Sequence, residues 1–300
     1  MQALIGTAEG LHELGDREAT AFTGREVTAL AVEEGPGVWA LLEGRTLVRR
    51  EGSGPWREVG ALPDAAEGTC LAATPGGLLV GTVGAGLWRW TDRGPVRVES
   101  FDRMPGREAW YTPWGDPPDT RSIAADAGGP LYVNVHVGGV ARSTDGGASW
   151  SPTIDVDADV HQIVAHETCA GYVFAAAAEG LWVSADGGDS WATETEGLHA
   201  RYCRAVALAG DAVLVSASTG PGGRRAALYR RDLAGGRFER CRGGLPEWFG
   251  DNLDTHCLAA SGPVVILGTE DGVVHTSTDG GRTFSVLAKG LPPVRAVVLR

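Results

Sequence analysis

The sequence has 300 residues, of which 45 are glycine and only two are methionine, and its formal net charge at pH 7 is −12. So many glycines favour short strands joined by turns, and because they follow no Gly-X-Y period the chain is not collagen-like. The acidic balance argues against nucleic acid or an anionic membrane as the main partner.

The cysteines and the N-terminal residues bear on the cellular compartment. Five cysteines is an odd number, no two form a Cys-x-x-Cys pair, and Cys70, Cys203 and Cys257 lie in apolar runs. Residues 1–10 lack the basic and apolar regions of a signal peptide, and no apolar run approaches the length of a membrane span. We therefore expect a reduced, cytoplasmic protein that is a monomer.

Short apolar runs rich in small residues recur along the chain at intervals of about 40 residues. They are Thr28–Ala31, Cys70–Ala73, Ser122–Ala125, Gln162–Ala165, Arg204–Ala207, Cys257–Ala260 and Arg295–Val298. Each run except the last is followed by a second apolar stretch, a turn and two further short stretches. A repeat of this length with four short strands is typical of a β-propeller blade, whose innermost strand would be the small-residue run.

The two ends of the chain together complete one further repeat. Residues 2–11 resemble a second strand and its turn without an inner strand before them, and residues 293–299 resemble an inner strand. We therefore predict an all-β fold, a single closed seven-bladed propeller over residues 1–300 with four-stranded blades. The C-terminal strand, residues 294–299, would complete the first blade and cover its edge. A six-bladed ring is the alternative.

Three octapeptides share the pattern S-x-D-G-G-x-[ST]-[WF], at residues 143–150, 184–191 and 277–284. Glycine adopts the positive φ values of a tight turn, the aspartate accepts hydrogen bonds from turn amides, and the aromatic ring returns to the sheet. We predict a structural role for the aspartates and aromatic residues, with the rings buried. These residues are Asp145, Asp186, Asp279, Trp150, Trp191 and Phe284.

The octapeptide pattern resembles the Asp-box, or bacterial neuraminidase repeat (BNR), of the sialidase-like β-propeller superfamily of WD40/YVTN/BNR-like repeat proteins. The resemblance implies a propeller, but Asp-boxes occur in enzymes, receptors and assembly factors alike, so it implies no single activity. Sialidases also carry an Arg-Ile-Pro motif, and neither Arg-Ile-Pro nor Arg-Leu-Pro occurs here. The chain is therefore not a typical sialidase, and no sialidase catalytic residue is carried over.

Polar pairs precede three of the apolar runs: Asp119 with Arg121, Asp159 with His161, and Asp254 with His256. Residues i and i+2 of a strand project to the same side, and in a propeller the connections into the inner strands open on one face around the axis. We therefore expect a polar ligand site at the channel mouth. Its candidate catalytic residues are Asp119, Asp159 and Asp254, and its candidate ligand-binding residues are Arg121, His136, His161, Arg201, Tyr202, Arg204, His256, Trp110, Trp114 and Trp248.

The leading hypothesis is a soluble propeller that binds a small polar ligand, such as a saccharide, at the channel mouth. Carboxylates that face one another across a cleft would allow glycoside hydrolysis, whose stereochemistry depends on their separation. A third hypothesis is a metal-dependent enzyme, in which His136, His161, His256, Asp159 and Asp254 are the candidate ligands of a divalent metal ion through nitrogen and oxygen atoms.

Two further interpretations remain open. The Asp-x-His and Asp-x-Arg pairs could be hydrogen-bonded ties between neighbouring blades, with no role in binding. The propeller could also be a non-catalytic scaffold for a protein partner. The four remaining histidines are expected to be structural or on the surface: His12, His166, His199 and His275.

Overall fold

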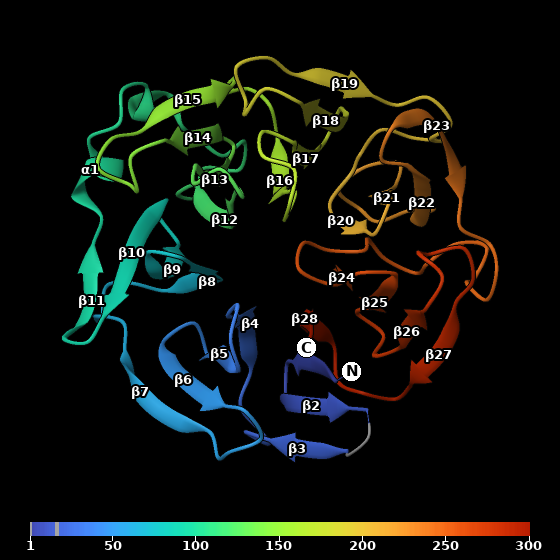
Figure 1. Ribbon diagram of the computed structural model, residues 1–300, viewed down its shortest axis with the longest axis horizontal. Coiled ribbons are helices and arrows are strands. Elements are labelled where there is room, and N and C mark those ends of the chain that lie inside the picture. Colours follow the sequence, from blue (N-terminus) through green and yellow to red (C-terminus); the bar gives the residue numbers. More distant parts are fainter. Residues whose placement is uncertain (1, 16–17) are drawn as a thin grey trace. The chain divides into compact units, whose positions relative to one another are not determined.

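The residues that the structure describes form seven four-stranded antiparallel sheets, the blades of an all-β propeller (Figure 1). This computed structural model describes residues 2–15 and 18–300. It agrees with the seven predicted blades and excludes the six-bladed alternative. The chain divides into two compact units: unit 1 is Met1–Val27, Ala176–Leu181 and Thr193–Arg300, and unit 2 is Thr28–Ala175 and Trp182–Ala192. That all 300 residues form a single closed domain stays a prediction.

Unit 1 contains three whole sheets. The first has the order β28-β1-β2-β3, with β1 (Ala3–Thr7), β2 (Gly10–Leu14), β3 (Ala19–Ala21) and β28 (Val294–Leu299). The second comprises β20 (Val206–Ala209), β21 (Ala212–Ala217), β22 (Ala227–Asp232) and β23 (Gly235–Arg240). The third comprises β24 (Leu258–Ser261), β25 (Val264–Gly268), β26 (Val274–Ser277) and β27 (Ser285–Ala288).

Three further sheets lie in unit 2, apart from the first residue of β4. They are β4 (Val27–Val32), β5 (Gly37–Leu42), β6 (Thr46–Glu51) and β7 (Arg57–Ala61); β8 (Gly68–Thr74), β9 (Gly77–Thr82), β10 (Gly86–Thr91) and β11 (Gly94–Arg97); and β12 (Asp119–Ala125), β13 (Leu131–His136), β14 (Gly139–Ser143) and β15 (Ser151–Ile154). The connection from β11 to β12 contains α1 (Glu99–Asp102) and a 3-10 turn, η1 (Arg107–Ala109). The seventh sheet draws residues from both units: β16 (Val160–Ala165), β17 (Val173–Ala177), β18 (Gly180–Ser184) and β19 (Ala192–Glu194).

Within a blade, burial is greatest in the second strand and least in the outermost strand. Every residue of β13 and of β21 is buried, whereas no residue of β7 is. A polar side chain within a fully buried strand needs hydrogen-bond partners. Asn134 of β13 has them, because its Oδ1 accepts from Ser122 Oγ at 2.7 Å and its Nδ2 donates to the Val160 carbonyl at 2.6 Å. One buried amide therefore links three strands of unit 2.

The two ends of the chain meet in the first sheet of unit 1. β28 pairs antiparallel with β1, from Ala3 opposite Leu299 to Thr7 opposite Val294, with an irregularity at Gly6/Thr7. Beyond the strands, the backbones of Gln2 and Arg300 exchange two hydrogen bonds, of 2.8 and 2.9 Å. The edge of β1 that faces β28 is therefore covered.

The three S-x-D-G-G turns share one hydrogen-bond pattern. In the first turn, Asp145 Oδ1 accepts from the Ser149 amide at 2.9 Å and Oδ2 accepts from Ser149 Oγ at 2.5 Å. Ser143 Oγ donates to Asp145 Oδ1 and accepts from the Gly147 amide, both at 2.8 Å. Gly146 and Gly147 have φ values of 73° and 95°, which favour glycine. The same contacts recur at the second and third turns, around Asp186 and Asp279.

The aromatic residues that end these turns differ in burial. Trp150 and Phe284 are buried, with 6% and 7% of their surface exposed. Trp191 is only partly buried, and its indole nitrogen donates to Thr153 Oγ1 at 2.7 Å. The prediction that all three rings are buried is therefore wrong for Trp191, because the polar edge of its indole reaches a hydroxyl group near the surface.

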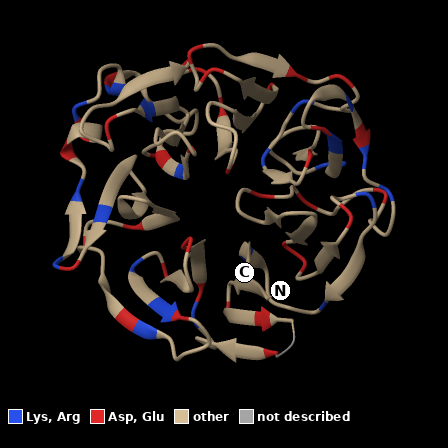
Figure 2. Ribbon diagram, viewed as in Figure 1, with Lys and Arg blue, Asp and Glu red and all other residues tan. Residues whose placement is uncertain are grey.

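Charged residues of both signs occur throughout the described chain. Lysine and arginine residues are interspersed with aspartate and glutamate residues along the strands and turns of both units (Figure 2). In residues 2–15 and 18–300, no helix has the length and apolar character that crossing a membrane requires. All five cysteines are free thiols, and only Cys169 is exposed.

Candidate functional site

Two histidines and an aspartate come together in unit 2. His136 is the last residue of β13, Asp159 directly precedes β16, and His161 lies within β16. Asp159 Oδ1 lies 2.8 Å from His136 Nε2, and Asp159 Oδ2 lies 3.4 Å from His161 Nε2. One ligand atom from each residue falls within 4.8 Å of the other two. Among the described residues, no other group of three or more His, Cys, Asp or Glu side chains is so placed.

Burial strengthens the electrostatics of this cluster. The side chain of His161 is fully buried, and those of His136 and Asp159 are 11% and 28% exposed. Burial alone would raise the pKa of Asp159, but the hydrogen bonds and charges of the two histidines outweigh it and hold that pKa well below its usual range. Asp159 is therefore a carboxylate at neutral pH, oriented by two imidazole rings.

A second carboxyl group of unit 2 behaves in the opposite way. Asp119 begins β12 and lies opposite His136 in the β12–β13 pairing. Burial raises its pKa, although the charges of Arg121 and His136 oppose that effect. Asp119 Oδ1 is buried without a hydrogen-bond partner among the described residues. The two carboxyl groups that flank His136 therefore differ in proton affinity.

The two tryptophans expected at the site have different surroundings. The Trp114 ring is 58% exposed and lies 5.1 Å from the His136 ring between centroids. Trp110 instead packs inward, 5.7 Å from the Phe101 ring and 4.6 Å from the Arg107 guanidinium. Trp114 can meet a ligand beside His136, whereas the contacts of Trp110 are those of a residue that holds its own loop in place.

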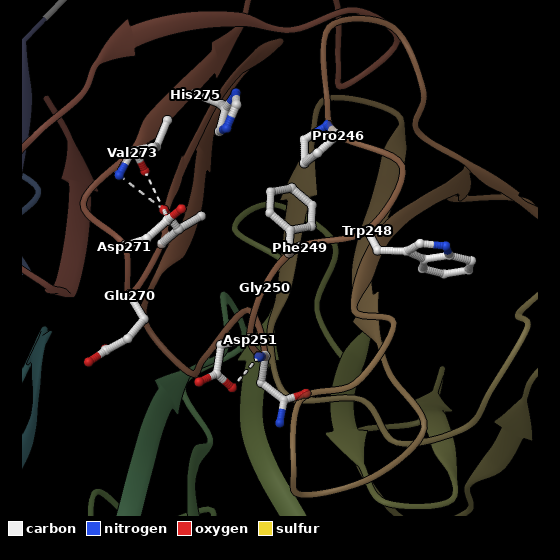
Figure 3. A pocket seen from close by; sticks show the side chains of 11 residues that line it. Pro246, Trp248, Phe249, Gly250, Asp251, Glu270, Asp271, Val273 and His275 are labelled. Carbon is white, nitrogen blue, oxygen red and sulfur yellow. Dashed lines mark hydrogen bonds between the residues drawn. The ribbon is translucent and has the colours of Figure 1, made fainter.

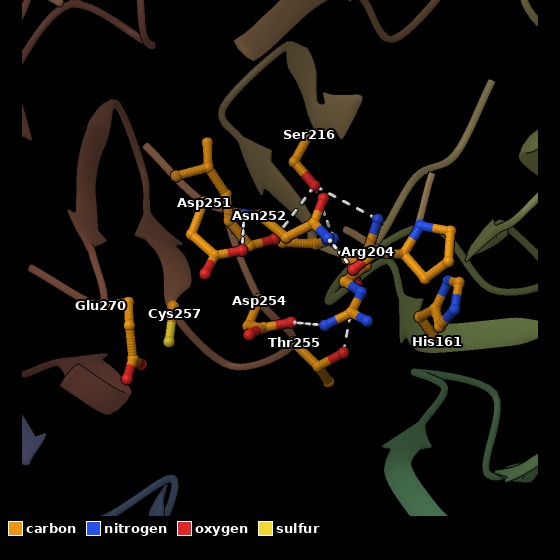
Figure 4. Close-up of polar contacts among 12 residues, drawn as sticks. His161, Arg204, Ser216, Asp251, Asn252, Asp254, Thr255, Cys257 and Glu270 are labelled. Carbon is orange, nitrogen blue, oxygen red and sulfur yellow. Dashed lines mark hydrogen bonds and ion pairs between the residues drawn. The ribbon is translucent and has the colours of Figure 1, made fainter. Parts of the chain in front are cut away.

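Several residues expected at the mouth lie in unit 1, where they form a different arrangement. Arg204 Nη1 binds Asp254 Oδ1, and the Arg204 carbonyl accepts from Thr255 Oγ1 at 3.3 Å (Figure 4). Arg204 Nη2 also lies 3.4 Å from the Tyr202 hydroxyl. Arg204 lies two positions before β20, which begins one sheet, and Asp254 lies four positions before β24, which begins the next. These contacts are the inter-blade ties that the sequence left as an alternative.

Of the five candidate metal ligands, His136, Asp159 and His161 of unit 2 come together. In unit 1, Asp254 has a guanidinium partner. His256 has a positive φ of 67°, and its carbonyl accepts from the Val297 amide at 2.8 Å. The backbone of His256 therefore binds β28, the strand that contains Val297. Arg201, the remaining candidate, is exposed.

Trp248 belongs to a cationic cluster of unit 1 that the sequence did not predict. The guanidinium groups of Arg240 and Arg225 lie 3.8 and 4.6 Å from its ring centroid, and the His199 ring lies 4.9 Å away. His199 Nδ1 is 2.7 Å from the Tyr229 hydroxyl. His199 was expected to be structural or on the surface, and no local sequence pattern links it to a tyrosine thirty positions along the chain.

Comparisons with known proteins bear on the fold. No family model matches the sequence, and no curated protein does. Similar solved structures include YCF48 bound to D1 peptide, with 13% identity and a TM-score of 0.60 over 88% of this chain and 84% of that chain. A GH74 xyloglucanase from Xanthomonas campestris has 17% identity and a TM-score of 0.62 over 94% of this chain and 46% of that chain.

A third similar structure is virginiamycin B lyase from Staphylococcus aureus, with selenomethionine, at 15% identity and a TM-score of 0.63 over 87% of this chain and 83% of that chain. The present chain spans a little under half the length of the xyloglucanase. At such low identities these likenesses establish the β-propeller fold alone.

Proposed function

We infer that this propeller binds a small polar ligand at His136, Asp159 and His161 through a divalent transition-metal ion. The observation that carries the proposal is the convergence of two imidazole nitrogens and a carboxylate oxygen within 4.8 Å. Two histidines with one carboxylate are a common three-residue ligand set for zinc and for non-haem iron, and they leave coordination positions open. Bound there, the metal would supply a Lewis-acidic centre for oxygen atoms of the ligand.

The chain's own residues favour a ligand with both polar and apolar faces. Trp114 offers a largely exposed ring beside His136. Asp119 lies opposite the same histidine in the sheet, and the Arg121 guanidinium acts electrostatically on this carboxyl group. A saccharide combines hydroxyl groups with an apolar ring face, so it fits these surroundings. The resemblance of the octapeptides to Asp-boxes and the likeness in fold to a xyloglucanase support this ligand class.

The metal can be tested directly. Protein freed of metal by a chelator should take up one Zn²⁺ or Mn²⁺ ion per chain in isothermal titration calorimetry. His136→Ala and Asp159→Asn should each weaken that binding at least tenfold. His166→Ala is the matched control, since His166 lies in unit 2 outside the cluster and bonds the amides of its own turn. Absence of metal uptake by the unsubstituted protein would refute the metal site.

The ligand requires its own measurement. A xyloglucan oligosaccharide should bind the metal-loaded protein, and Trp114→Ala should weaken that binding while leaving metal uptake unchanged. A peptide is the alternative ligand, since YCF48 was solved with one. If the Trp114→Ala variant binds the oligosaccharide as tightly as the unsubstituted protein does, the oligosaccharide does not bind at this site.

Glycoside hydrolysis without metal is a second candidate, favoured by one observation. Asp119 has a raised pKa and Asp159 a lowered pKa, and a pair of carboxyl groups whose proton affinities are pushed apart can serve as acid and base. In this case release of reducing ends from the oligosaccharide should persist in the presence of a chelator. It should be lost in Asp119→Asn, which removes the proton donor without changing the shape of the side chain.

A further inference from the structure

A cavity of ≈ 610 Å³ opens within unit 1, between two segments that lead into neighbouring sheets. One segment, residues 246–252, connects β23 towards β24, and the other is the turn between β25 and β26 (Figure 3). This volume lies in the range of pockets that bind small molecules. None of the residues assigned to a binding site above, other than Trp248, lines it.

A buried histidine forms part of the cavity wall. His275 lies in β26 and is only 6% exposed, and its Nδ1 has no hydrogen-bond partner among the described residues. Its ring meets the edge of Phe249 at 6.0 Å and 87°. Burial lowers the pKa of His275, so that the imidazole is neutral near pH 7. A polar atom buried without a partner is costly, and a ligand that hydrogen-bonds to it recovers that cost.

The cavity rim is acidic on the side of Asp251 and Asp271, whereas the guanidinium groups of Arg240 and Arg225 lie against Trp248. Asp251 accepts a hydrogen bond from the Asn252 amide at 2.7 Å, and Asp271 accepts one from Thr269 Oγ1. Both aspartates are exposed, and neither forms an ion pair with another described residue. The third carboxylate, that of Glu270, is already bound to Arg295. Two oriented carboxylates without a cationic partner therefore face a cavity whose inner wall is aromatic.

We propose that this cavity binds a small organic cation that has a primary ammonium or guanidinium group and an apolar body. The cationic group would lie between Asp251 and Asp271, and the body would pack along Phe249 and Pro246. A hydrogen-bonding group at the far end would reach His275 Nδ1. The rim carboxylates disfavour an anionic ligand, since like charges in a partly enclosed site repel each other strongly. The proposal does not depend on the metal cluster of unit 2.

Calorimetry with three matched compounds tests the required charge. Tyramine carries an aromatic ring, a hydroxyl group and a primary ammonium; tyrosol replaces the ammonium by a hydroxyl; 4-hydroxyphenylacetate replaces it by a carboxylate. Tyramine should bind at least tenfold more tightly than tyrosol, and the carboxylate compound should not bind. Equal binding of tyramine and tyrosol, or no binding of tyramine at millimolar concentration, would overturn the proposal.

Variants locate the binding. Asp251→Asn and Asp271→Asn should each weaken tyramine binding several-fold, and more steeply at low salt. Asp92→Asn is the matched control, because it removes the same charge from an exposed turn of unit 2, outside the cavity. All three aspartates are exposed, so unchanged melting temperatures should show that the variants fold. Weakening by Asp92→Asn as large as that by Asp271→Asn would mean that only the overall charge attracts the amine.

Two further measurements test whether the ligand reaches His275 and whether the cation comes from a small molecule or from a protein side chain. The ring signals of His275 should shift on addition of tyramine in a histidine-labelled NMR sample, whereas the His166 signals should not. Lysine amide that is acetylated on its α-nitrogen keeps the side-chain ammonium but lacks an aromatic body, so it should bind more weakly than tyramine. Tighter binding of the lysine compound would assign the cavity to a protein side chain and contradict a small-molecule ligand.

Discussion

Arg204 and Asp254 form an ion pair that joins two sheets of unit 1, one beginning with β20 and the other with β24. The side chain of Arg204 is 19% exposed and that of Asp254 is 48% exposed. Without the Asp254 carboxylate, the mostly buried guanidinium of Arg204 would lose this ion pair. We therefore expect this pair to contribute to the packing of the blades.

Asp254→Asn should lower the free energy of unfolding by about 1–3 kcal/mol, the cost of a mostly buried charged group that loses its partner. Urea unfolding of both proteins measures the difference. Asp64→Asn serves as the control, since its 94% exposed side chain pairs with an arginine, Arg45, that is itself 44% exposed, and the change should alter stability by no more than about 0.5 kcal/mol. Equal effects of the two substitutions would contradict a tie between blades.

Asp145 should make stability depend on acidic pH. Hydrogen bonds from Ser149 and Ser143 lower its pKa to about 2, below the value of about 3.9 expected in the unfolded chain. A lowered pKa adds stability above the unfolded value, and this stability is lost as pH falls through the folded value. The stability difference between the unsubstituted protein and Asp145→Asn should therefore be full at pH 7 and shrink between about pH 4 and pH 2. A difference that is constant over this range would contradict the hydrogen-bonded carboxylate.

Trp150 and Trp191 should contribute differently to the free energy of unfolding, because they differ in burial. Trp150→Ala removes a ring that is buried and meets Phe101 edge-on at 5.3 Å, so it should cost about 3–5 kcal/mol in urea unfolding. Trp191→Ala removes a partly exposed ring in the equivalent position and should cost clearly less. The same cost for both would mean that the turn itself, and not the packing of the ring, requires the aromatic residue.

A single thiol should react in the folded protein. Burial raises the pKa of Cys70 and of Cys241 to about 12 each, and the pKa values of Cys203 and Cys257 are raised for the same reason. Thiolates react and thiols do not, so a chromogenic disulfide reagent should modify only the exposed Cys169 at neutral pH. Five thiols should react after denaturation. Rapid reaction of the reagent with a Cys169→Ser variant would show that a sheet unfolds locally and exposes one of the four buried thiols.

The sequence was sufficient to predict the blades because their signals are local. A run such as Cys70–Ala73 starts the same four-strand repeat that Gln162–Ala165 starts, and both lie in innermost strands. The aspartate of each S-x-D-G-G turn bonds groups only two to four positions away, so its role is encoded in the octapeptide. The different burial of Trp150 and Trp191 could not be predicted, since it depends on neighbours outside the repeat.

The candidate site could be predicted only in part. Asp159 and His161 are two positions apart at the start of β16, so their proximity follows from extended backbone geometry. Their third partner, His136, was among the predicted residues, but its pairing with Asp159 depends on how β13 lies against β16. His275 looked like an ordinary strand residue, because the cavity beside it is made by a segment more than twenty positions earlier in the chain.

The pairing of β28 with β1 sets an order of events during synthesis. Among the described strands, β1 leaves the ribosome first, and β28, the partner for one of its edges, leaves last. Throughout translation that edge presents free amide and carbonyl groups, which another nascent chain can bind. Contacts so distant in sequence also form slowly. A chaperone that shields β1 until β28 arrives should therefore raise the yield of folded protein more than one that acts after release.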